Sequence, residues 1–179
     1  DSANGKSGAL LSNLSKNPEL KSILLEETPW VLEAKNETEQ KRNIVVLFDL
    51  ARLSRDMDAA LATLQQAQSP NGGFVWFSGG PDDRYITQYI ITGLGKLKKA
   101  GAIPEAYKKT TVRITNNGLG YLHKRIKEDY DQLIKLKANL NNQQISSLQI
   151  QYLYALSFHL DQPMEGAYLK AMTYYHKQA

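Results

Sequence analysis

The fold of this chain is decided by the stretch Gln68-Ser69-Pro70-Asn71-Gly72-Gly73-Phe74-Val75-Trp76-Phe77-Ser78-Gly79-Gly80-Pro81-Asp82-Asp83. It is rich in Gly, Pro, Asn and Asp, the residue types that favour turns and loops. A segment with helical spacing ends in glutamines just before it, and another begins at Arg84 just after it. The stretch therefore predicts a sharp corner between two helices.

The tightest part of this corner is followed by three aromatic rings. Asn71-Gly72-Gly73 offers the left-handed backbone angles that a sharp reversal needs. The rings after it either plug the base of a helical hairpin or form a patch for a ligand or a partner, with the indole in contact. The candidate structural or interaction loop consists of Gln68, Asn71, Gly72, Gly73, Phe74, Trp76 and Phe77.

Two adjacent carboxylates close the corner. Asp82 and Asp83 precede the helix that begins at Arg84, where negative charge is favoured by the helix dipole and a side-chain oxygen can cap the first turn. We expect them to be helix caps. The alternative, a general acid and base pair, would need a further converging group. The same interpretation applies to the other carboxylates that flank helix ends, Asp49, Asp56 and Asp58.

Outward from the corner, the sequence predicts helix after helix and no convincing strand. The expected helices span residues 37–53, 56–68, 84–100, 105–140, 145–160 and 166–176, after an earlier helix that Asn17-Pro18 begins and Thr28-Pro29-Trp30 ends. We expect one helical domain over residues 1–179, with residues 1–8 disordered.

The apolar faces of these helices predict how they pack. The helix over 37–53 is apolar on more than one face, which predicts packing on several sides. The helix over 84–100 is expected to bury Ile86, Tyr89, Ile90, Leu94 and Leu97. Very apolar helices alternate with one-faced ones across short connections, which indicates antiparallel hairpins in two layers. The predicted fold is all-α, an α/α toroid-like array of antiparallel hairpins that forms a partial toroid. Glycines within two of its helices suggest close helix contacts.

The composition excludes several classes of site. The chain has 179 residues, a net charge of +4 and no cysteine, so disulfides, thiolate metal sites and a cysteine nucleophile are excluded. Residues 61–179 carry 14 Lys/Arg and 8 Asp/Glu, but no nucleic-acid-binding motif accompanies this excess, and no nucleic-acid partner is expected. The longest aliphatic or aromatic run covers five residues, 44–48, so no membrane span is expected.

The histidines and tyrosines carry no catalytic motif. His123, His159 and His176 have neither the spacing of a helical zinc site nor a His-Glu-x-x-His string, so neither a metal nor a cofactor is expected. The ten tyrosines have helical spacing and are expected to be half-buried. Because tyrosine is favoured in contact surfaces, an interface that uses them remains the alternative.

Three segments together resemble the bacterial alpha-2-macroglobulin family. The first is Leu24-Leu25-Glu26-Glu27-Thr28-Pro29-Trp30-Val31, and the second is Glu37-Thr38-Glu39-Gln40-Lys41-Arg42. The third is Gln68 to Phe77 together with Arg84-Tyr85-Ile86-Thr87-Gln88-Tyr89-Ile90, the more specific part. The similarity covers about Leu10 to Leu97, and more loosely extends to Leu160.

This resemblance implies the thioester-type domain of that family, which is an α/α toroid. Similar bacterial proteins are large periplasmic or extracellular envelope proteins, often lipid-anchored, and are thought to trap proteases. Cleavage of a bait region triggers a rearrangement, and an internal Cys–Gln thioester then acylates the protease. The implied partners are proteases, through the full-length parent protein, and other domains of the same chain.

The chain departs from the family pattern at the reactive motif. No Cys-x-Glu-Gln string is present, and the nearest string, Glu37-Thr38-Glu39-Gln40, has a carboxylate where the cysteine would stand. Either the sequence begins after the motif, which we favour, or the parent has lost it. We therefore expect no catalytic or thioester residue here, and a non-catalytic C-terminal portion of the thioester-type domain. The alternative is an α/α-toroid enzyme acting on glycans or isoprenoids, which requires acidic residues converging in a pocket.

Overall fold

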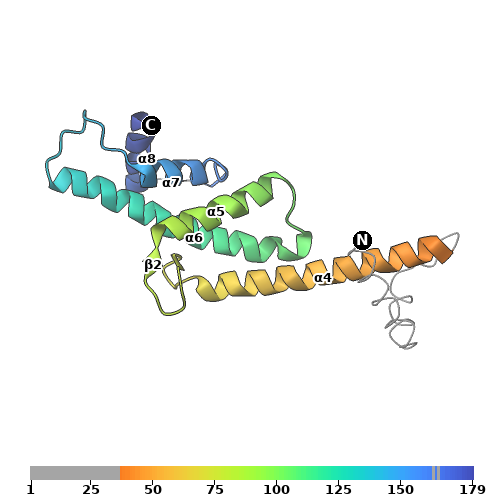
Figure 1. Cartoon of the computed structure of the whole chain (residues 1–179). Coiled ribbons are helices and arrows are strands. Elements are labelled where there is room, and N and C mark those ends of the chain that lie inside the picture. The colour runs from red at the N-terminus through yellow and green to blue at the C-terminus, as the bar shows by residue number, and fades with distance from the viewer. Residues whose placement is uncertain (1–36, 163, 165) are drawn as a thin grey trace. The chain divides into compact units, whose positions relative to one another are not determined.

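The computed structural model describes residues 37–162, 164 and 166–179. This part contains five α-helices and two short strands: α4 (Glu37–Ala67), β1 (Phe74–Val75), β2 (Asp82–Asp83), α5 (Arg84–Lys99), α6 (Glu105–Lys135), α7 (Ser147–Leu156) and α8 (Gly166–Gln178) (Figure 1). The prediction of an all-α fold is confirmed for these residues. The predicted helix after Asn17, its end at Thr28-Pro29-Trp30 and the disorder expected for residues 1–8 lie outside them.

The chain divides into two compact units, residues 1–59 and residues 60–179. The boundary falls within α4, so the described part of the first unit is the helical stretch 37–59. The second unit contains the last turns of α4, the corner and the four helices that follow it.

In the first unit, the predicted turn between residues 53 and 56 is wrong. The helix continues through this region, and Arg52 forms an ion pair at 3.8 Å with Asp56, which lies one helical turn further along. Neither glycine nor proline occurs there, so nothing in the backbone ends the helix. Two apolar residues of this stretch, Val46 and Leu50, are 44% and 53% exposed.

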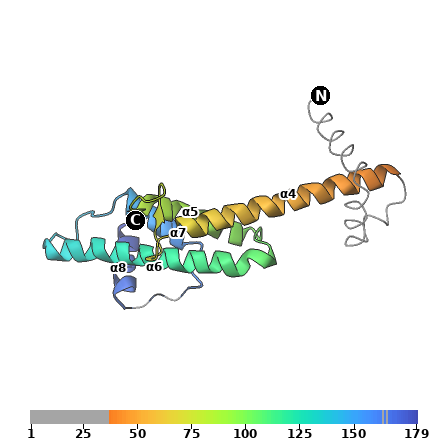
Figure 2. The same cartoon turned by 90° about the horizontal axis from the view of Figure 1, so that it is seen from below.

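In the second unit, α5 and α6 form an antiparallel hairpin. Arg84 at the start of α5 contacts Asp129 near the end of α6, and Ile91 lies against Gly118 in the middle of both helices. Figures 1 and 2 show the two helices side by side. This hairpin builds the centre of the core, whose buried members are Phe74, Ile91, Leu94, Ile114, Leu119, Tyr121, Leu122, Ile126, Tyr152, Leu156, Ala171 and Tyr175.

The third helix of this unit, α7, packs on both members of the hairpin. It is antiparallel to α6, since His123 contacts Tyr152 and Asp129 contacts the earlier residue Gln149. It runs in the same direction as α5, since Gln88 contacts the start of α7 and Lys96 lies over a ring near its end. Helix α8 adds Ala171 and Tyr175 to the core. None of the described helices is long and apolar enough to cross a membrane.

The buried face of α5 agrees with the predicted one only in part: Leu94 lies in the core and Ile86 and Ile90 pack against it, but the other two residues do not. Tyr89 is 71% exposed and Leu97 is 48% exposed, whereas Thr87 and Gln88 are buried. The Thr87 hydroxyl accepts from the Phe74 N–H and Gln88 Nε2 donates to the Leu148 carbonyl, which compensates in part for the removal of these side chains from water. The helix is therefore rotated relative to the face that hydrophobicity alone indicates.

Two other helices are shorter than predicted. Helix α6 ends at Lys135, and Lys137 follows it with a φ of +53°, so the predicted end near residue 140 is wrong. Helix α7 begins at Ser147 rather than at 145, because Ser146 and Gln149 form a capping box in which the Ser146 backbone N–H donates to Gln149 Oε1 at 2.9 Å. It ends at Leu156, four residues before the predicted end.

Candidate functional site

The corner between α4 and α5 reverses at Gly72. The N–H of Gly72 donates to the Ser69 carbonyl at 2.9 Å, and the φ of Gly72 is +94°. A Cβ atom at this position would lie 2.1 Å from the Asn117 carbonyl oxygen on α6, so only glycine fits. Of the three residues expected to supply left-handed angles, Gly72 alone does so.

The other two residues of the reversal have different roles. Gly73 provides space, because a Cβ there would lie 2.8 Å from the ring of Tyr121. Asn71 uses its side chain: Oδ1 accepts from the Gly73 N–H at 2.9 Å, and Nδ2 donates to Asp82. The loop is thus closed by its own side chains across the reversal.

Gln68 fastens the loop to α6. Its Nε2 donates to the carbonyl oxygen of Gly72, four residues away along the chain, at 3.1 Å. It also donates to the carbonyl oxygen of Ile114, 46 residues away, at 3.0 Å. One amide therefore satisfies a loop carbonyl and a helix carbonyl together. The glutamine at the end of α4 joins the corner to the neighbouring hairpin.

The three aromatic rings of the corner divide into a plug and a patch. Phe74 is fully buried in the core, and its N–H donates to Thr87 Oγ1 at 2.9 Å. Trp76 and Phe77, in contrast, are 68% and 63% exposed. The packing interpretation therefore describes Phe74 only. We call the exposed pair Trp76 and Phe77 the aromatic tip.

The aromatic tip borders a hollow of about 540 Å³. The last turns of α4 form one wall through Thr63 and Gln66, and the loop forms the other through Pro70, Val75 and the tip itself. Gly79 has a φ of +79° in the turn after the tip, where the Gly80 N–H donates to the Phe77 carbonyl at 3.0 Å. The tip is thus presented on a closed, hydrogen-bonded turn.

The two carboxylates at the end of the corner have separate tasks. Asp83 is the N-cap of α5, and its Oδ1 accepts from the Ile86 N–H at 2.8 Å. Asp82 is not a cap; hydrogen bonds from Ser69 and Asn71 lower the pKa of its carboxyl group below the usual value. Both strands of the small sheet meet here, with Phe74 opposite Asp83. No strand was expected from the sequence, because each has only two residues.

The carboxylates outside the corner lie in the first unit and on exposed positions. Asp49 and Asp58 are exposed on α4, and Asp56 pairs with Arg52. Their side chains face solvent rather than the core, which is the ordinary position for a charged group on a helix.

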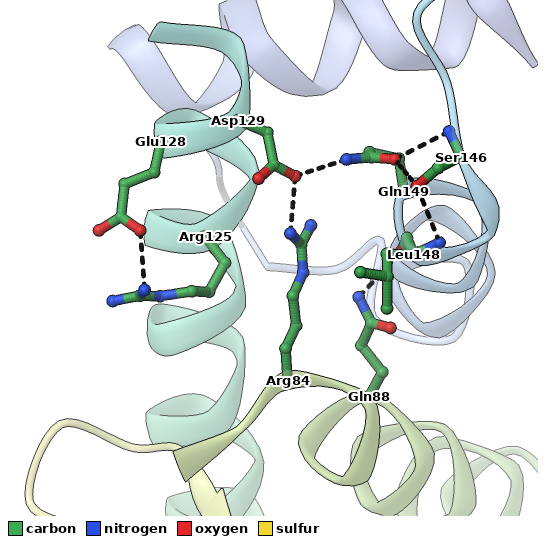
Figure 3. A network of polar contacts seen from close by, with 8 residues as sticks. All are labelled: Arg84, Gln88, Arg125, Glu128, Asp129, Ser146, Leu148 and Gln149. Carbon is green, nitrogen blue, oxygen red and sulfur yellow. Dashed lines mark hydrogen bonds and ion pairs between the residues drawn. The ribbon is translucent and has the colours of Figure 1, made fainter. Parts of the chain in front are cut away.

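Behind the corner lies a polar cluster that no local pattern in the sequence predicts. Arg84 Nη1 contacts Asp129 Oδ2 at 2.6 Å, and Gln149 Nε2 donates to the same oxygen at 2.6 Å (Figure 3). The side chains of Arg84 and Asp129 are only 14% and 26% exposed. Partners 45 residues apart in the sequence leave no local signal. The cluster connects the first residue of α5 to both α6 and α7.

A second polar contact beside this cluster also joins α5 to α7. Gln88 Nε2 donates to the Leu148 carbonyl at 2.9 Å, at the start of α7 (Figure 3). On the other side, Arg125 pairs with Glu128 at 2.9 Å and stacks near the ring of Tyr121, with 5.2 Å between guanidinium carbon and ring centre. Buried polar groups of this kind specify one arrangement of the helices.

The two described histidines of the core are held neutral by burial. His123 Nδ1 lies 2.8 Å from the Tyr152 hydroxyl, and burial lowers the pKa of His123 to about 4. His159 is 1% exposed, its Nε2 donates to the Ile91 carbonyl at 3.2 Å, and burial lowers its pKa as well. Among the described residues, no group of three or more potential His, Cys, Asp or Glu ligands converges as a metal site.

The corner combines a buried, hydrogen-bonded base with an exposed aromatic tip. Of its two carboxylates, Asp83 caps α5 and Asp82 closes the loop. Comparison of the chain with models of known protein families, with curated proteins and with solved structures finds no match. The residues of the corner are therefore the basis on which a function is proposed.

Proposed function

We propose that this chain is a non-catalytic helical domain of a bacterial alpha-2-macroglobulin-like envelope protein that traps proteases. In this proposal it forms the C-terminal portion of a thioester-type domain and contributes no reactive group. The parent protein acts in the periplasm or outside the cell. Proteases bind the parent, and other domains of the parent contact this chain.

One observation carries the proposal: the residues of the specific resemblance interlock at the corner. Gly72 and Gly73 fit against α6, Phe74 lies in the core, and the Phe74 N–H donates to the Thr87 hydroxyl. Gln88 joins the same stretch of α5 to the start of α7. The buried members of the resemblance therefore serve the architecture of the corner.

The helix directions also support a toroid. Helices α5 and α7 run in the same direction and touch, while α6 is antiparallel to both. Parallel neighbours in one layer, joined through helices of a second layer, are the repeating arrangement of an α/α toroid. We propose that these helices are a segment of such a ring.

The physical role of the corner in this function is to present the aromatic tip rigidly. Trp76 and Phe77 expose large rings at a small cost in conformational entropy, which makes aromatic residues efficient in protein contacts. The buried base prevents the loop from folding the rings back. The tip then serves as a contact for another domain of the parent or for the captured protease.

The proposal is tested by co-elution of a protease with the parent protein. The parent is mixed with active trypsin, and separately with trypsin whose active-site serine has been blocked, and each mixture is passed over a sizing column. Because trapping begins with cleavage, active trypsin is expected to elute with the parent and blocked trypsin to elute alone. Elution of both forms alone would contradict the proposal, and so would equal co-elution of both.

A pair of matched variants tests the aromatic tip in the same assay. Trp76→Ala combined with Phe77→Ala is expected to reduce the co-eluting fraction, whereas Leu160→Ala, at an apolar residue that is 78% exposed elsewhere, is expected to leave it unchanged. If the parent traps trypsin but the tip variant does so equally well, the role of the tip is wrong and the family function stands.

A further inference from the structure

A second surface, separate from the corner, is formed where α5 and α7 lie side by side. An open groove of about 370 Å³ runs between them. Tyr85, Tyr89 and Lys96 line it from α5, and Gln151 and Tyr154 line it from α7. Gly93 forms a gap in the α5 wall, since a Cβ there would meet no atom within 4 Å.

The walls of this groove are unusually rich in exposed tyrosine. Tyr85, Tyr89 and Tyr154 are 48%, 71% and 51% exposed. Their rings offer apolar area, and their hydroxyls can donate or accept hydrogen bonds. Three such residues on two helices make a surface that is suited to a chain with alternating apolar and polar groups.

The charge of the groove is positive and uncompensated. Lys96 Nζ lies over the Tyr154 ring, 5.6 Å from its centre. Among the described residues, those lining the groove include no carboxylate. Lys98 and Lys99 follow on the same helix end, although Lys98 pairs with Asp161. The groove therefore favours a ligand that brings negative charge.

The floor of the groove has an acceptor without a partner. Gln88 lines the groove and is 2% exposed. Its Nε2 donates to the Leu148 carbonyl, which fixes the orientation of the amide, and its Oε1 is buried without a hydrogen-bond partner among the described residues. Because this oxygen is buried, it is closed off from the groove, and Gln88 contributes a fixed part of the groove floor.

We propose that the groove between α5 and α7 binds an extended acidic peptide segment of a partner protein. Tyr85 and Lys96 are eleven residues apart on α5, or about 16 Å along the helix axis, which matches roughly five residues of extended chain. In this arrangement the apolar side chains of the peptide pack on the tyrosines, and a carboxylate pairs with Lys96. A neutral glycan would use the rings but leave the charge unused.

The proposal is tested with the full chain and a fluorescein-labelled peptide, Glu-Val-Glu-Val-Glu-Val with blocked ends, by fluorescence anisotropy. The corresponding Lys-Val peptide and unlabelled maltohexaose serve as competitors. We expect the acidic peptide to bind and added salt to weaken the binding, because exposed charges are screened over about 8 Å at physiological ionic strength. Neither competitor is expected to displace it. Displacement by the Lys-Val peptide or by maltohexaose would overturn the proposal, as would absence of binding.

Two matched glycine variants locate the site. Gly93→Gln places a side chain in the groove without entering the core, and Gly120→Gln places the same side chain in open space on α6. Both also replace a helix glycine, so their effects on the helix are alike. Gly93→Gln is expected to weaken peptide binding at least tenfold, and Lys96→Gln is expected to weaken it severalfold. Gly120→Gln is expected to leave the affinity unchanged. Equal affinity for Gly93→Gln and Gly120→Gln would place the peptide elsewhere and overturn the proposal.

Discussion

The close contact between α5 and α6 can be tested with two variants, each of which adds a methyl group at a different glycine of α6. Gly118 and Gly120 both lie inside α6. A Cβ at Gly118 would lie 2.4 Å from Ile91 Cδ1 and 2.8 Å from Ile91 Cγ1, whereas a Cβ at Gly120 would meet no atom within 4 Å. The variants Gly118→Ala and Gly120→Ala therefore share their effect on the helix and differ in packing.

The expected magnitudes follow from these distances. Alanine stabilises a helix interior by about 1 kcal/mol relative to glycine, so Gly120→Ala should raise the free energy of unfolding by about 0.5–1 kcal/mol. At Gly118 the same gain is opposed by overpacking, because carbon atoms prefer separations of roughly 3.5–4.0 Å and Ile91 is fully buried. Overpacking a core costs about 1–3 kcal/mol, so Gly118→Ala should be less stable than Gly120→Ala by that amount.

A second substitution identifies the clash. Ile91→Val removes Cδ1, the atom closest to the new methyl group, and should by itself cost about 0.5–1.5 kcal/mol. Combined with Gly118→Ala it should cost less than the sum of the two single changes, because the shortened side chain makes room. The difference from additivity, about 1 kcal/mol, measures the contact between the two positions.

The assay is urea unfolding followed by near-ultraviolet circular dichroism, which reports on packed tyrosines. Tyr121, Tyr152 and Tyr175 are buried within residues 60–179, so the signal follows the second unit. If Gly118→Ala proves as stable as Gly120→Ala, the close approach of α5 and α6 at Ile91 is wrong. Strict additivity with Ile91→Val would contradict the same contact.

Three further predictions concern the plug, the polar cluster and a buried histidine. Phe74→Ala should lower the free energy of unfolding by about 3–5 kcal/mol in urea, whereas Trp76→Ala, at an exposed ring, should change it by less than about 0.5 kcal/mol. Asp129→Asn weakens the pairing of a largely buried guanidinium and should lower the free energy of unfolding by about 2–4 kcal/mol. The same change at the exposed Asp161 should lower it by less than about 1 kcal/mol. Similar losses for the two variants would contradict the difference in burial between the two ion pairs. Because the pKa of His123 is lowered in the folded state to about 4, the unfolded state binds more protons and stability falls as the pH drops from about 6.5 to about 4. Between pH 7 and pH 4.5, the free energy of unfolding of His123→Asn should fall by about 2 kcal/mol less than that of the wild type. A variant with the same pH dependence as the wild type would contradict the burial of this ring.

The local features of the fold could be predicted because their signals are local. The corner lies where Gly72 and its neighbours break the helical pattern, and α5 begins at Arg84 as expected. The glycines of α5 and α6 indicated close contacts, and Gly95 and Gly118 make them, whereas Gly93 and Gly120 lie in open space. The spacing alone could not distinguish the two kinds, because that depends on which face meets the neighbouring helix.

The features that were missed depend on partners far away in the sequence. The rotation of α5 is set by Thr87 and Gln88, which are buried and form hydrogen bonds to Phe74 and Leu148. A hydrophobicity pattern treats both residues as polar surface. The aromatic rings of the corner also look alike in the sequence, and only the position of the core separates the buried one from the aromatic tip.

The central claim is that this chain belongs to a protein that traps proteases, and it is tested most directly by the size of the substrate that a trapped protease can still cleave. Trypsin is mixed with an excess of the parent protein and assayed on casein and on a short chromogenic peptide. Enclosure leaves the active site of trypsin intact but excludes large substrates. We therefore predict that casein cleavage falls strongly while peptide cleavage persists. Equal retention of both activities, or equal loss of both, would contradict the account.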